Sequence, residues 1–314
     1  MSFSGDVKEE LLSVNGNGRH CQIAELAAIF SYCGFARTDR FGQMQIGIAA
    51  ENKAIITKSF TLIKKTFNIY SDILIKKHNF SNKIFSYELC IQDMEEIEQI
   101  LMAIKKYKGS ELPQLRQPAD PLLLKKDCCR RAFIRGTYLA IGSMSNPEKG
   151  YHMEFVFDRQ GMADDFIKNL STFSIDAKMV LRKKNYVVYI KEGEEIVDML
   201  NIMGAHVSLM NLENTRIVKD MRNSINRRVN CETANIAKTV NAAAKQVEDI
   251  LFIQRVYGLH KLPDNLRQVA EVRLSYPEAS LVELSQLMDP PVGKSGVNHR
   301  LRKLSELAER LRVN

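Results

Sequence analysis

The last helical stretch of the chain carries side chains that can hydrogen-bond to a nucleic acid. An apolar stripe recurs there at the spacing of one helical face and consists of Val297, Leu301, Leu304, Ala308 and Leu311. The polar candidates outside this stripe are Lys294, Ser295, Asn298, His299, Arg300, Arg302 and Lys303. The pattern predicts a helix that packs through one face and presents hydrogen-bonding groups on the others.

These side chains differ in what they can bind on double-stranded DNA. In the major groove an amide such as that of Asn298 pairs with adenine, and a guanidinium such as that of Arg302 pairs with guanine. The remaining basic candidates, Lys294, Arg300 and Lys303, are better placed for phosphates. A basic helix with a merely solvated polar face is the alternative that the residues leave open.

Two predicted helices precede this one and would position it. The segment "LPDNLRQVAEVRLSYPEA" predicts a helix that Pro277 closes, and "SLVELSQLM" predicts a short helix capped by Ser280, with Glu283 at capping-box spacing. A short helix, a turn and a longer core-anchored helix are typical of a helix-turn-helix, here at about residues 280–311. The turn "DPPVGKS" is not a phosphate loop, because Met288 stands where that loop requires glycine.

A long helix is predicted upstream of these elements, over "SINRRVNCETANIAKTVNAAAKQVEDILFI". Its apolar residues recur at helical spacing and are Val229, Ile236, Val240, Val247 and Leu251. Weaker DNA-binding candidates occupy its other faces: Asn226, Arg227, Asn230 and Lys238. A phosphate-contacting face and a solvated face are equally compatible with this pattern.

The distribution of charge favours the same end of the chain. The net charge is +8 over 314 residues, and residues 217–314 hold 16 Lys and Arg against 11 Asp and Glu. Residues 1–216 hold 29 basic against 26 acidic residues, so the second segment carries most of the excess. We therefore expect two domains, 1–216 and 217–314, with an acidic partner bound by the second.

Several classes of protein are not indicated. No apolar run approaches the roughly 18 residues of a membrane span, and the N-terminus lacks the pattern of a secretory signal. The six cysteines form no CxxC pair and no histidine lies at zinc-ligand spacing, so we expect reduced core thiols, no metal and no cofactor. We expect a cytoplasmic, nucleoid-associated protein that neither binds a membrane nor acts on a small-molecule substrate.

Residues 1–216 predict the same order of elements twice. A helix, a strand, a helix, two strands and a helix precede the linker "GSELPQLRQPADP", and a similar order follows it. Halves at about 1–116 and 117–216 predict a pseudo-two-fold α+β domain of two αββ-type repeats, whose strands could form one curved sheet. An unrepeated α+β domain is the alternative.

One helix in each half resembles the LAGLIDADG helix of homing endonucleases. The matching stretches are "ELAAIFSYCG" and "FIRGTYLAIG". The resemblance implies that the two helices pack side by side through small residues, namely Ala27, Ala28, Ser31, Gly136 and Ala140. It also implies that each helix ends at a glycine, Gly34 or Gly142, and we expect both glycines in the left-handed conformation.

The nuclease chemistry of that family is not expected here. Active members place an acidic residue before the terminal glycine to hold divalent metal, whereas this chain has Cys33 and Ile141. A thiol and an alkyl group do not suit Mg²⁺, so no catalytic residues are predicted. A displaced metal site would need other acids, of which the candidates are Asp39, Asp158 and Asp164.

The strand "YHMEFVF" in the second half predicts a sheet with one buried face. Alternation places Met153, Phe155 and Phe157 on one side and His152 and Glu154 on the other. The corresponding face of homing endonucleases lies on DNA, but a glutamate there would be repelled by phosphate. A protein-contact role for this saddle domain is left open beside DNA binding.

Most of the chain resembles the WhiA family of transcriptional regulators. The resemblance rests on "SFSGDVKEEL", "CCRRAFIRGTYLAIGSMSNPEKGYHMEF", "NRRVNCETANIAKTVNAAAKQ" and "SLVELSQLMDPPVGKSGVNHRLRKL". It implies a DNA-binding regulator of bacterial cell division, chromosome segregation or sporulation-type development. Such a regulator would have no nuclease activity and would read DNA mainly through its helix-turn-helix. In filamentous members a small iron–sulfur regulator acts alongside. A division-associated scaffold and, less well supported, a metal-dependent endonuclease are the alternatives.

Overall fold

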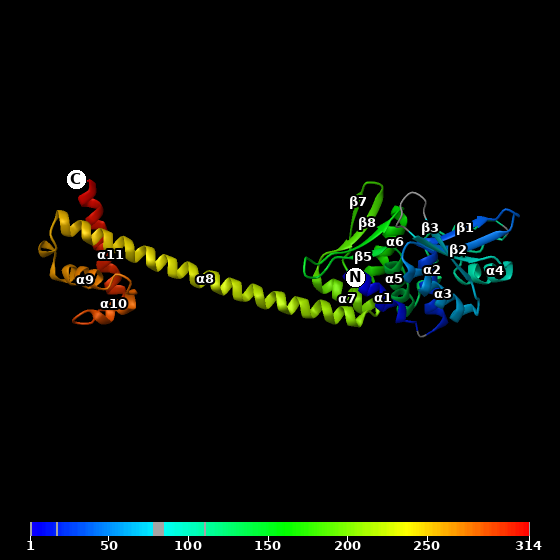
Figure 1. Ribbon diagram of the computed structural model, residues 1–314, viewed down its shortest axis with the longest axis horizontal. Helices are drawn as coiled ribbons and strands as arrows, with labels where there is room; N and C mark the ends of the chain where they lie inside the picture. Colours follow the sequence, from blue (N-terminus) through cyan, green and yellow to red (C-terminus); the bar gives the residue numbers. More distant parts are fainter. Residues whose placement is uncertain (1, 17, 78–84, 110, 314) are drawn as a thin grey trace. The chain divides into compact units, whose positions relative to one another are not determined.

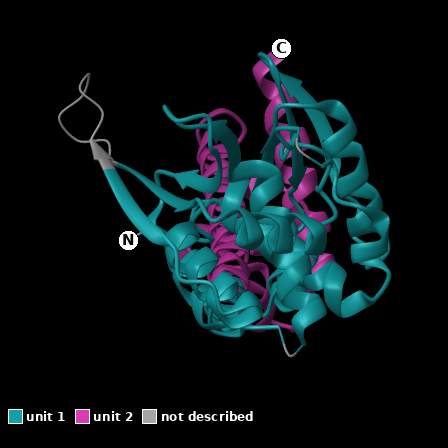
Figure 2. Ribbon diagram, turned by 90° about the vertical axis from the view of Figure 1, so that its right-hand side faces the viewer, with its two compact units in different colours: residues 1–218 teal, residues 219–314 magenta. Residues whose placement is uncertain are grey.

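The computed structural model describes residues 2–16, 18–77, 85–109 and 111–313 (Figure 1). The chain divides into two compact units, residues 1–218 and 219–314 (Figure 2). The first unit is α+β and the second is helical, which confirms the predicted fold class. Helix α8 (His206–Val256) belongs to both units, so the boundary expected after residue 216 falls inside a helix.

The two halves of the first unit repeat one order of elements. After α1 (Phe3–Ser13), the first half contains α2 (Arg19–Cys33), β1 (Gly34–Thr38), β2 (Met44–Ala50), α3 (Lys53–Phe67), β3 (Asp72–Lys77), β4 (Phe85–Ile91) and α4 (Met94–Ala103). After the 3-10 turn η1 (Pro121–Leu124), the second contains α5 (Asp127–Ile141), β5 (Gly142–Met144), β6 (Met153–Phe157), α6 (Gln160–Ser171), β7 (Lys178–Arg182), β8 (Asn185–Ile190) and α7 (Gly193–Met203). The predicted internal repeat is confirmed.

The strands form two sheets, and the prediction of one curved sheet is wrong. Each sheet has four antiparallel strands, in the order β1-β2-β4-β3 in the first half and β5-β6-β8-β7 in the second. Strands β1 and β5 were not predicted. Each starts at the glycine that follows its helix and pairs with the next strand of its own half, which closes the two sheets separately.

Helices α2 and α5 lie side by side at the centre of the first unit, as predicted. Their contact is close because the small residues leave room for the backbones. A Cβ added to Gly136 of α5 would lie 2.6 Å from the Glu25 carbonyl oxygen of α2 and 2.9 Å from the Ala28 Cβ. On α2, Ala28 packs into the core of the second half while Ala27 packs into that of the first. The pair therefore joins the two halves.

The glycines that end these helices do not adopt the predicted left-handed conformation. Gly34 has φ −72° and ψ 146°, and Gly142 has φ −81° and ψ 148°, which is extended backbone in both cases. Glycine is required at both positions because a side chain would collide with the preceding helical turn. A Cβ would lie 2.3 Å from the Phe30 carbonyl oxygen at Gly34, and 2.8 Å from the Tyr138 carbonyl oxygen at Gly142. Each glycine lets the chain turn directly from helix into strand.

The second unit is a small helical domain with a core of its own. The end of α8 leads through the 3-10 turn η2 (Leu259–Lys261) to α9 (Asp264–Ser275), α10 (Leu281–Leu287) and α11 (Lys294–Val313). The predicted helix boundaries near Pro277 and Ser280 are confirmed, and both hydrogen bonds of the predicted capping box form between Ser280 and Glu283. Over the part of the chain that the structure describes, every helix is too short or too polar for a membrane span.

Candidate nucleic-acid interface

Helix α11 is anchored in the core of the second unit by its apolar stripe. Val297, Leu301, Leu304 and Ala308 are buried, and Leu311 packs against the same core at partial burial. The core also contains residues of α8, α9 and α10, so three helices fix the orientation of α11. Burial of such a stripe defines which side of the helix faces solvent.

The polar candidates of α11 lie on the face opposite this core. Most of them are exposed, namely Lys294, Ser295, Asn298, His299, Arg302 and Lys303, whereas Arg300 is half-buried beside the stripe. The helix begins after Gly293, whose carbonyl oxygen accepts hydrogen bonds from the backbone N–H of Gly296 (2.8 Å) and Val297 (3.1 Å). The exposed set therefore occupies the first half of α11, the part that a helix-turn-helix inserts into a groove.

The basic residue nearest the end of α11 has a different environment. The Nη1 atom of Arg312 lies 2.9 Å from Oδ1 of Asp249, whose side chain is buried in α8, and its guanidinium lies over the ring of Phe252. Lys245 of α8 also pairs with Glu309 at 3.5 Å. These contacts hold the end of α11 against α8. The solvated positive charge of α11 is consequently concentrated towards its start.

Helix α10 and the following turn are fixed by local contacts. Leu284 of α10 is buried in the shared core, and the capping box of Ser280 and Glu283 defines where the helix begins. In the turn between α10 and α11, the backbone carbonyl of Asp289 accepts a hydrogen bond from the side-chain amide of Gln268 in α9. The turn is longer than a minimal helix-turn-helix connection, yet it is tied to the domain.

The weaker candidates on α8 are all exposed. They are Asn226, Arg227, Asn230 and Lys238. The apolar residues predicted to alternate with them are also exposed, since Val229, Ile236 and Val240 have relative exposures of 52%, 64% and 58%. This part of α8 therefore has no buried stripe within the described structure, and its helical spacing alone does not indicate which face binds a partner.

The position of the nuclease carboxylates is occupied by groups that do not suit a divalent cation. Cys33 is buried, which raises the pKa of its thiol to about 11 despite the opposing charges of Arg116 and Lys8. Arg116 also donates a hydrogen bond from Nε to the Gly34 carbonyl oxygen at 3.3 Å. Ile141 packs against the core of the second half. A protonated thiol and an alkyl group therefore stand at the two positions before the terminal glycines, as the sequence predicts.

The three acids considered as displaced metal ligands do not come together. Oδ1 of Asp39 accepts hydrogen bonds from the backbone N–H of Phe41 (2.8 Å) and Gln43 (2.9 Å), which makes it a turn residue. Asp158 is exposed and Asp164 is half-buried on α6. Within the described residues, none of the three belongs to a group of metal-ligating side chains.

The sheet of the second half has the predicted buried face. Met153, Phe155 and Phe157 are buried, whereas Glu154 is half-buried on the other side. The Glu154 carboxylate accepts from Arg182 at 3.5 Å and lies 3.2 Å from Nε2 of His152. The polar face of this sheet thus contains an acid that is already paired with its basic neighbours.

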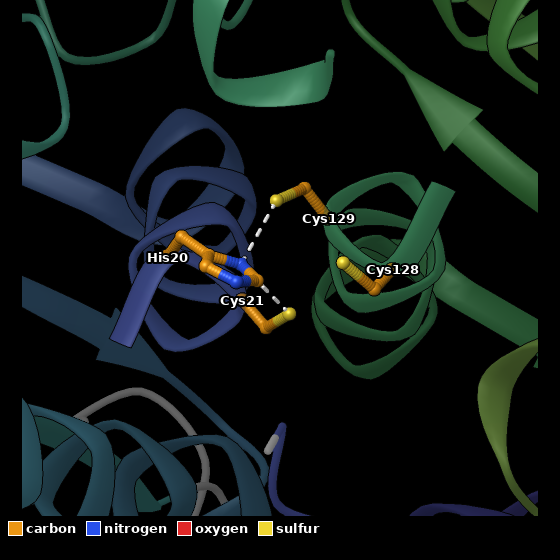
Figure 3. A group of neighbouring side chains, drawn as sticks. All are labelled: His20, Cys21, Cys128 and Cys129. Atoms are coloured by element: carbon orange, nitrogen blue, oxygen red, sulfur yellow. Dashed lines mark hydrogen bonds between the residues drawn. The ribbon is translucent and has the colours of Figure 1, made fainter. Parts of the chain in front are cut away.

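Four potential metal ligands, which the sequence spacing did not indicate, meet where α2 and α5 begin (Figure 3). They are His20 and Cys21 of α2 and Cys128 and Cys129 of α5. Burial, and after it the neighbouring thiol of Cys128, raises the pKa of Cys21 and of Cys129. The expectation that the cysteines are core thiols is wrong for Cys128 and Cys231, which are exposed.

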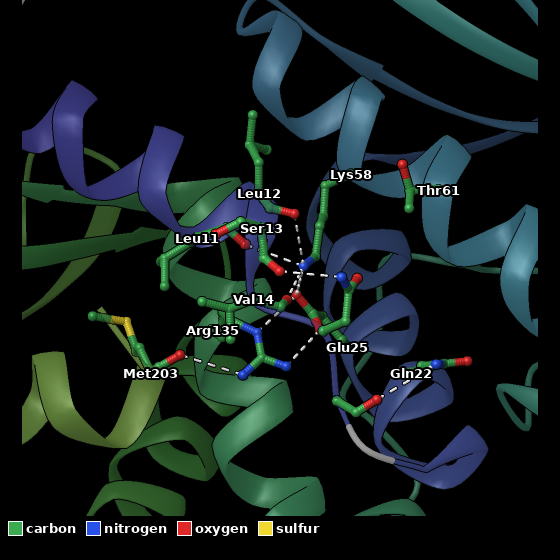
Figure 4. A network of polar contacts seen from close by, with 12 residues as sticks. Leu11, Leu12, Ser13, Val14, Gln22, Glu25, Lys58, Thr61, Arg135 and Met203 are labelled. Atoms are coloured by element: carbon green, nitrogen blue, oxygen red, sulfur yellow. Dashed lines mark hydrogen bonds and ion pairs between the residues drawn. The ribbon is translucent and has the colours of Figure 1, made fainter. Parts of the chain in front are cut away.

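A buried ionic network joins the same two helices to α1 and α3 (Figure 4). The Glu25 carboxylate accepts two hydrogen bonds from the Arg135 guanidinium, from Nε at 3.0 Å and from Nη2 at 2.7 Å. Lys58 Nζ lies 3.4 Å from Oε1 of Glu25 and donates to backbone carbonyls at the end of α1, including those of Leu11 and Val14. Burial lowers the pKa of Lys58, and the Glu25 charge opposes that shift.

Three family descriptions match successive parts of the chain. They are the WhiA N-terminal LAGLIDADG-like domain at residues 19–105, the WhiA LAGLIDADG-like domain at 130–222 and the WhiA C-terminal HTH domain at 225–308. A "Probable cell division protein WhiA" from Lachnoclostridium phytofermentans is 50% identical over 313 residues, which are 99% of this chain and 100% of that protein. The chain belongs to the WhiA family.

Other WhiA proteins match the chain over the same length. The relative from Clostridium novyi is 45% identical over 313 residues, which are 99% of this chain and 99% of that protein. The crystal structure of the full-length WhiA protein of Thermatoga maritima is 25% identical, with a TM-score of 0.60 and 99% coverage of both chains. WhiA proteins thus share the two LAGLIDADG-like halves and the helix-turn-helix described above.

Proposed function

We propose that this WhiA protein is a sequence-specific DNA-binding regulator that acts at the nucleoid on bacterial cell division, chromosome segregation or sporulation-type development. The observation that carries the proposal is the exposed polar face at the start of α11, on a helix whose opposite face is buried in the core. The relatives are named probable cell division proteins, and these names support a role in cell division.

The geometry of the second unit supports a division of roles among the side chains. Helix α10 would cross the DNA backbone while the first half of α11 enters the major groove. Asn298 and Arg302 are exposed there and would bond to base edges. Phosphate contacts are assigned to Lys294, Arg300 and Lys303, with Ser295 and His299 beside them and the α8 candidates as weaker additions.

Replacement of Arg302 by alanine should cost about 1–3 kcal/mol of binding free energy on the preferred duplex and relax the choice of base there. Lys303→Ala should weaken preferred and scrambled duplexes by similar factors and reduce the salt slope by about one, because a phosphate contact carries no base information. Binding of each folded variant to both duplexes is measured at several salt concentrations, with the preferred duplex selected from a random pool by the full-length protein.

Arg310→Ala is the matched control, since Arg310 is an exposed basic residue near the end of the same helix. It should leave the preference between the two duplexes unchanged. Equal losses on both duplexes for Arg302→Ala would contradict the assigned face of α11. That outcome would favour a scaffold protein whose second unit holds DNA without reading it.

The first unit is proposed to lack nuclease activity. We expect the purified protein to leave duplex DNA intact in Mg²⁺ or Mn²⁺, because the thiol of Cys33 and the alkyl group of Ile141 replace the carboxylates of a metal-dependent endonuclease. Supercoiled and linear DNA incubated with each ion tests this. Cleavage that depends on metal and disappears when one acidic residue is mutated would contradict it.

We propose that the first unit binds a protein partner rather than DNA. Its nearly balanced charge and the paired Glu154 on the sheet of the second half support protein rather than phosphate as the ligand of that surface. No membrane or small-molecule substrate enters the proposal. The DNA partner is assigned to the second unit alone.

A further inference from the structure

The first turns of α2 and α5 bring three thiols and an imidazole to one point. The ligand atoms of His20, Cys21, Cys128 and Cys129 all lie within 4.8 Å of one another. Nδ1 of His20 is 3.1 Å from the sulfur of Cys21 and 3.3 Å from that of Cys129. Figure 3 shows the four side chains pointing into the space between the two helices.

This donor set has the chemistry of a zinc site. Three thiolates and one imidazole form one of the common tetrahedral arrangements around Zn²⁺, with Zn–S near 2.3 Å and Zn–N near 2.0–2.1 Å. Those bond lengths place neighbouring ligand atoms about 3.5–3.8 Å apart, so the present side chains need to approach by about 1 Å at most. Soft sulfur ligands also disfavour Mg²⁺ and Ca²⁺.

We propose that His20, Cys21, Cys128 and Cys129 bind one Zn²⁺ ion that links α2 to α5. On binding, the three thiols lose their protons to solvent, and the ion and its thiolates together carry one excess negative charge. The positive ends of the two helix dipoles lie at the site, and Lys126 is the residue before α5. These charges offset the negative charge of the loaded site.

The ion can reach the site from solvent. Cys21 and Cys129 are buried, whereas His20 and Cys128 are exposed. A pocket of about 440 Å³ opens beside them and is lined by Asn15, Arg131 and His206 among others. Buried sulfurs on the inner side and an open outer side allow an ion to enter without unfolding the unit.

An ion at this position would link the two halves of the first unit. Helices α2 and α5 join the two halves of the first unit, and the ligands come two from each helix. A bound ion would therefore resist separation of the halves at this end of the helix pair. This inference is independent of DNA binding, since every ligand belongs to the first unit.

Titration of the full-length protein with Co²⁺ as a spectroscopic substitute tests the site. The protein is reduced without thiols, stripped with a chelator and titrated with the metal alone. We expect one Co²⁺ per chain, visible bands of a tetrahedral site, and a thiolate-to-cobalt charge-transfer band with the intensity of three thiolates. Zn²⁺ should then displace Co²⁺ and abolish these bands, because Zn²⁺ has no partly filled d shell.

Two variants locate the ligands. Cys128→Ser replaces an exposed ligand and should reduce the charge-transfer band to two thiolates. It should also weaken Zn²⁺ binding by more than the roughly 10–100-fold that loss of a group hydrogen-bonded to a ligand costs. Cys231→Ser is the matched control, because Cys231 is also exposed but lies in the second unit; it should retain the full spectrum and affinity.

Three results would overturn the proposal. The first is the absence of thiolate bands in the unaltered protein, which needs no variant and so does not depend on how a variant folds. The second is a spectrum that Cys128→Ser leaves unchanged. The third is a protein that binds no Co²⁺ when reduced but forms a disulfide within this group in air, which would make it a redox pair instead.

Discussion

Replacement of Glu25 by alanine is expected to lower the free energy of unfolding of the first unit by about 3–5 kcal/mol. The Glu25 side chain is fully buried, and its carboxylate is the partner of the Arg135 guanidinium and the Lys58 ammonium. Without it, two cations would remain in the interior without their counter-charge. The loss of a buried partner costs more than the intact pair contributes, because the remaining charges keep their desolvation penalty.

The pH dependence of this loss follows from Lys58. Burial lowers the pKa of its ammonium below the ordinary value of 10.5, and the Glu25 charge opposes this shift, so the pKa of Lys58 should fall further in Glu25→Ala. Between the folded and unfolded pKa values the unfolded chain binds a proton that the folded chain does not. Stability of the variant should therefore rise with pH through this window.

Chemical denaturation of the wild-type and variant proteins at several pH values measures both effects. Asp165→Ala is the matched control, because Asp165 forms an exposed ion pair with Lys168 in the same unit. It should leave the free energy of unfolding nearly unchanged. A Glu25→Ala variant as stable as this control would show that the network does not stabilise the joint between the halves.

Much of the fold could be predicted because its periodicities are strong. The helices and the repeated order in the first unit follow from apolar spacing, and the capping box from the spacing of Ser280 and Glu283. Strands β1 and β5 were missed because each is short and continues directly from a helix. Their glycines, Gly34 and Gly142, do end the helices as predicted, but their backbone is extended rather than left-handed, and steric contact with the preceding turn is what requires glycine there.

The candidate DNA-binding face was predictable for a related reason. A single stripe from Val297 to Ala308 decides which side of α11 is buried, and the exposed side follows. The same reasoning did not extend to α8, where Val229 and Ile236 recur at helical spacing but are exposed. Periodicity indicates a helix, whereas burial depends on what packs against it.

The groups between α2 and α5 could not be predicted from local spacing. Cys21 and Cys129 are far apart in the sequence, and so are Glu25 and Arg135. Each pair meets only because the small residues at the helix contact let the two backbones approach. Glu25 and Arg135 both stood within the LAGLIDADG-like stretches, but the partner of each lies on the other helix.

Separation of the two units should leave most of the DNA affinity with the second one. The segment from Ile217 to Asn314 carries five of the eight net positive charges, the exposed face of α11 and a hydrophobic core of its own. Its affinity should fall steeply with salt, since phosphate contacts release counterions. The segment 1–216 should lose at least about 10³-fold in affinity for the preferred duplex, the usual lower limit that separates specific from non-specific binding.

The most direct measurement is binding of the full-length protein and of each segment to the preferred and a scrambled duplex across a range of salt, after circular dichroism confirms that each segment is folded. The predicted result is a preference for the selected duplex in the full-length protein and in the segment from Ile217 onward, with no preference in the segment 1–216. Equally tight and equally selective binding by the segment 1–216 at the same salt would contradict a helix-turn-helix that reads DNA.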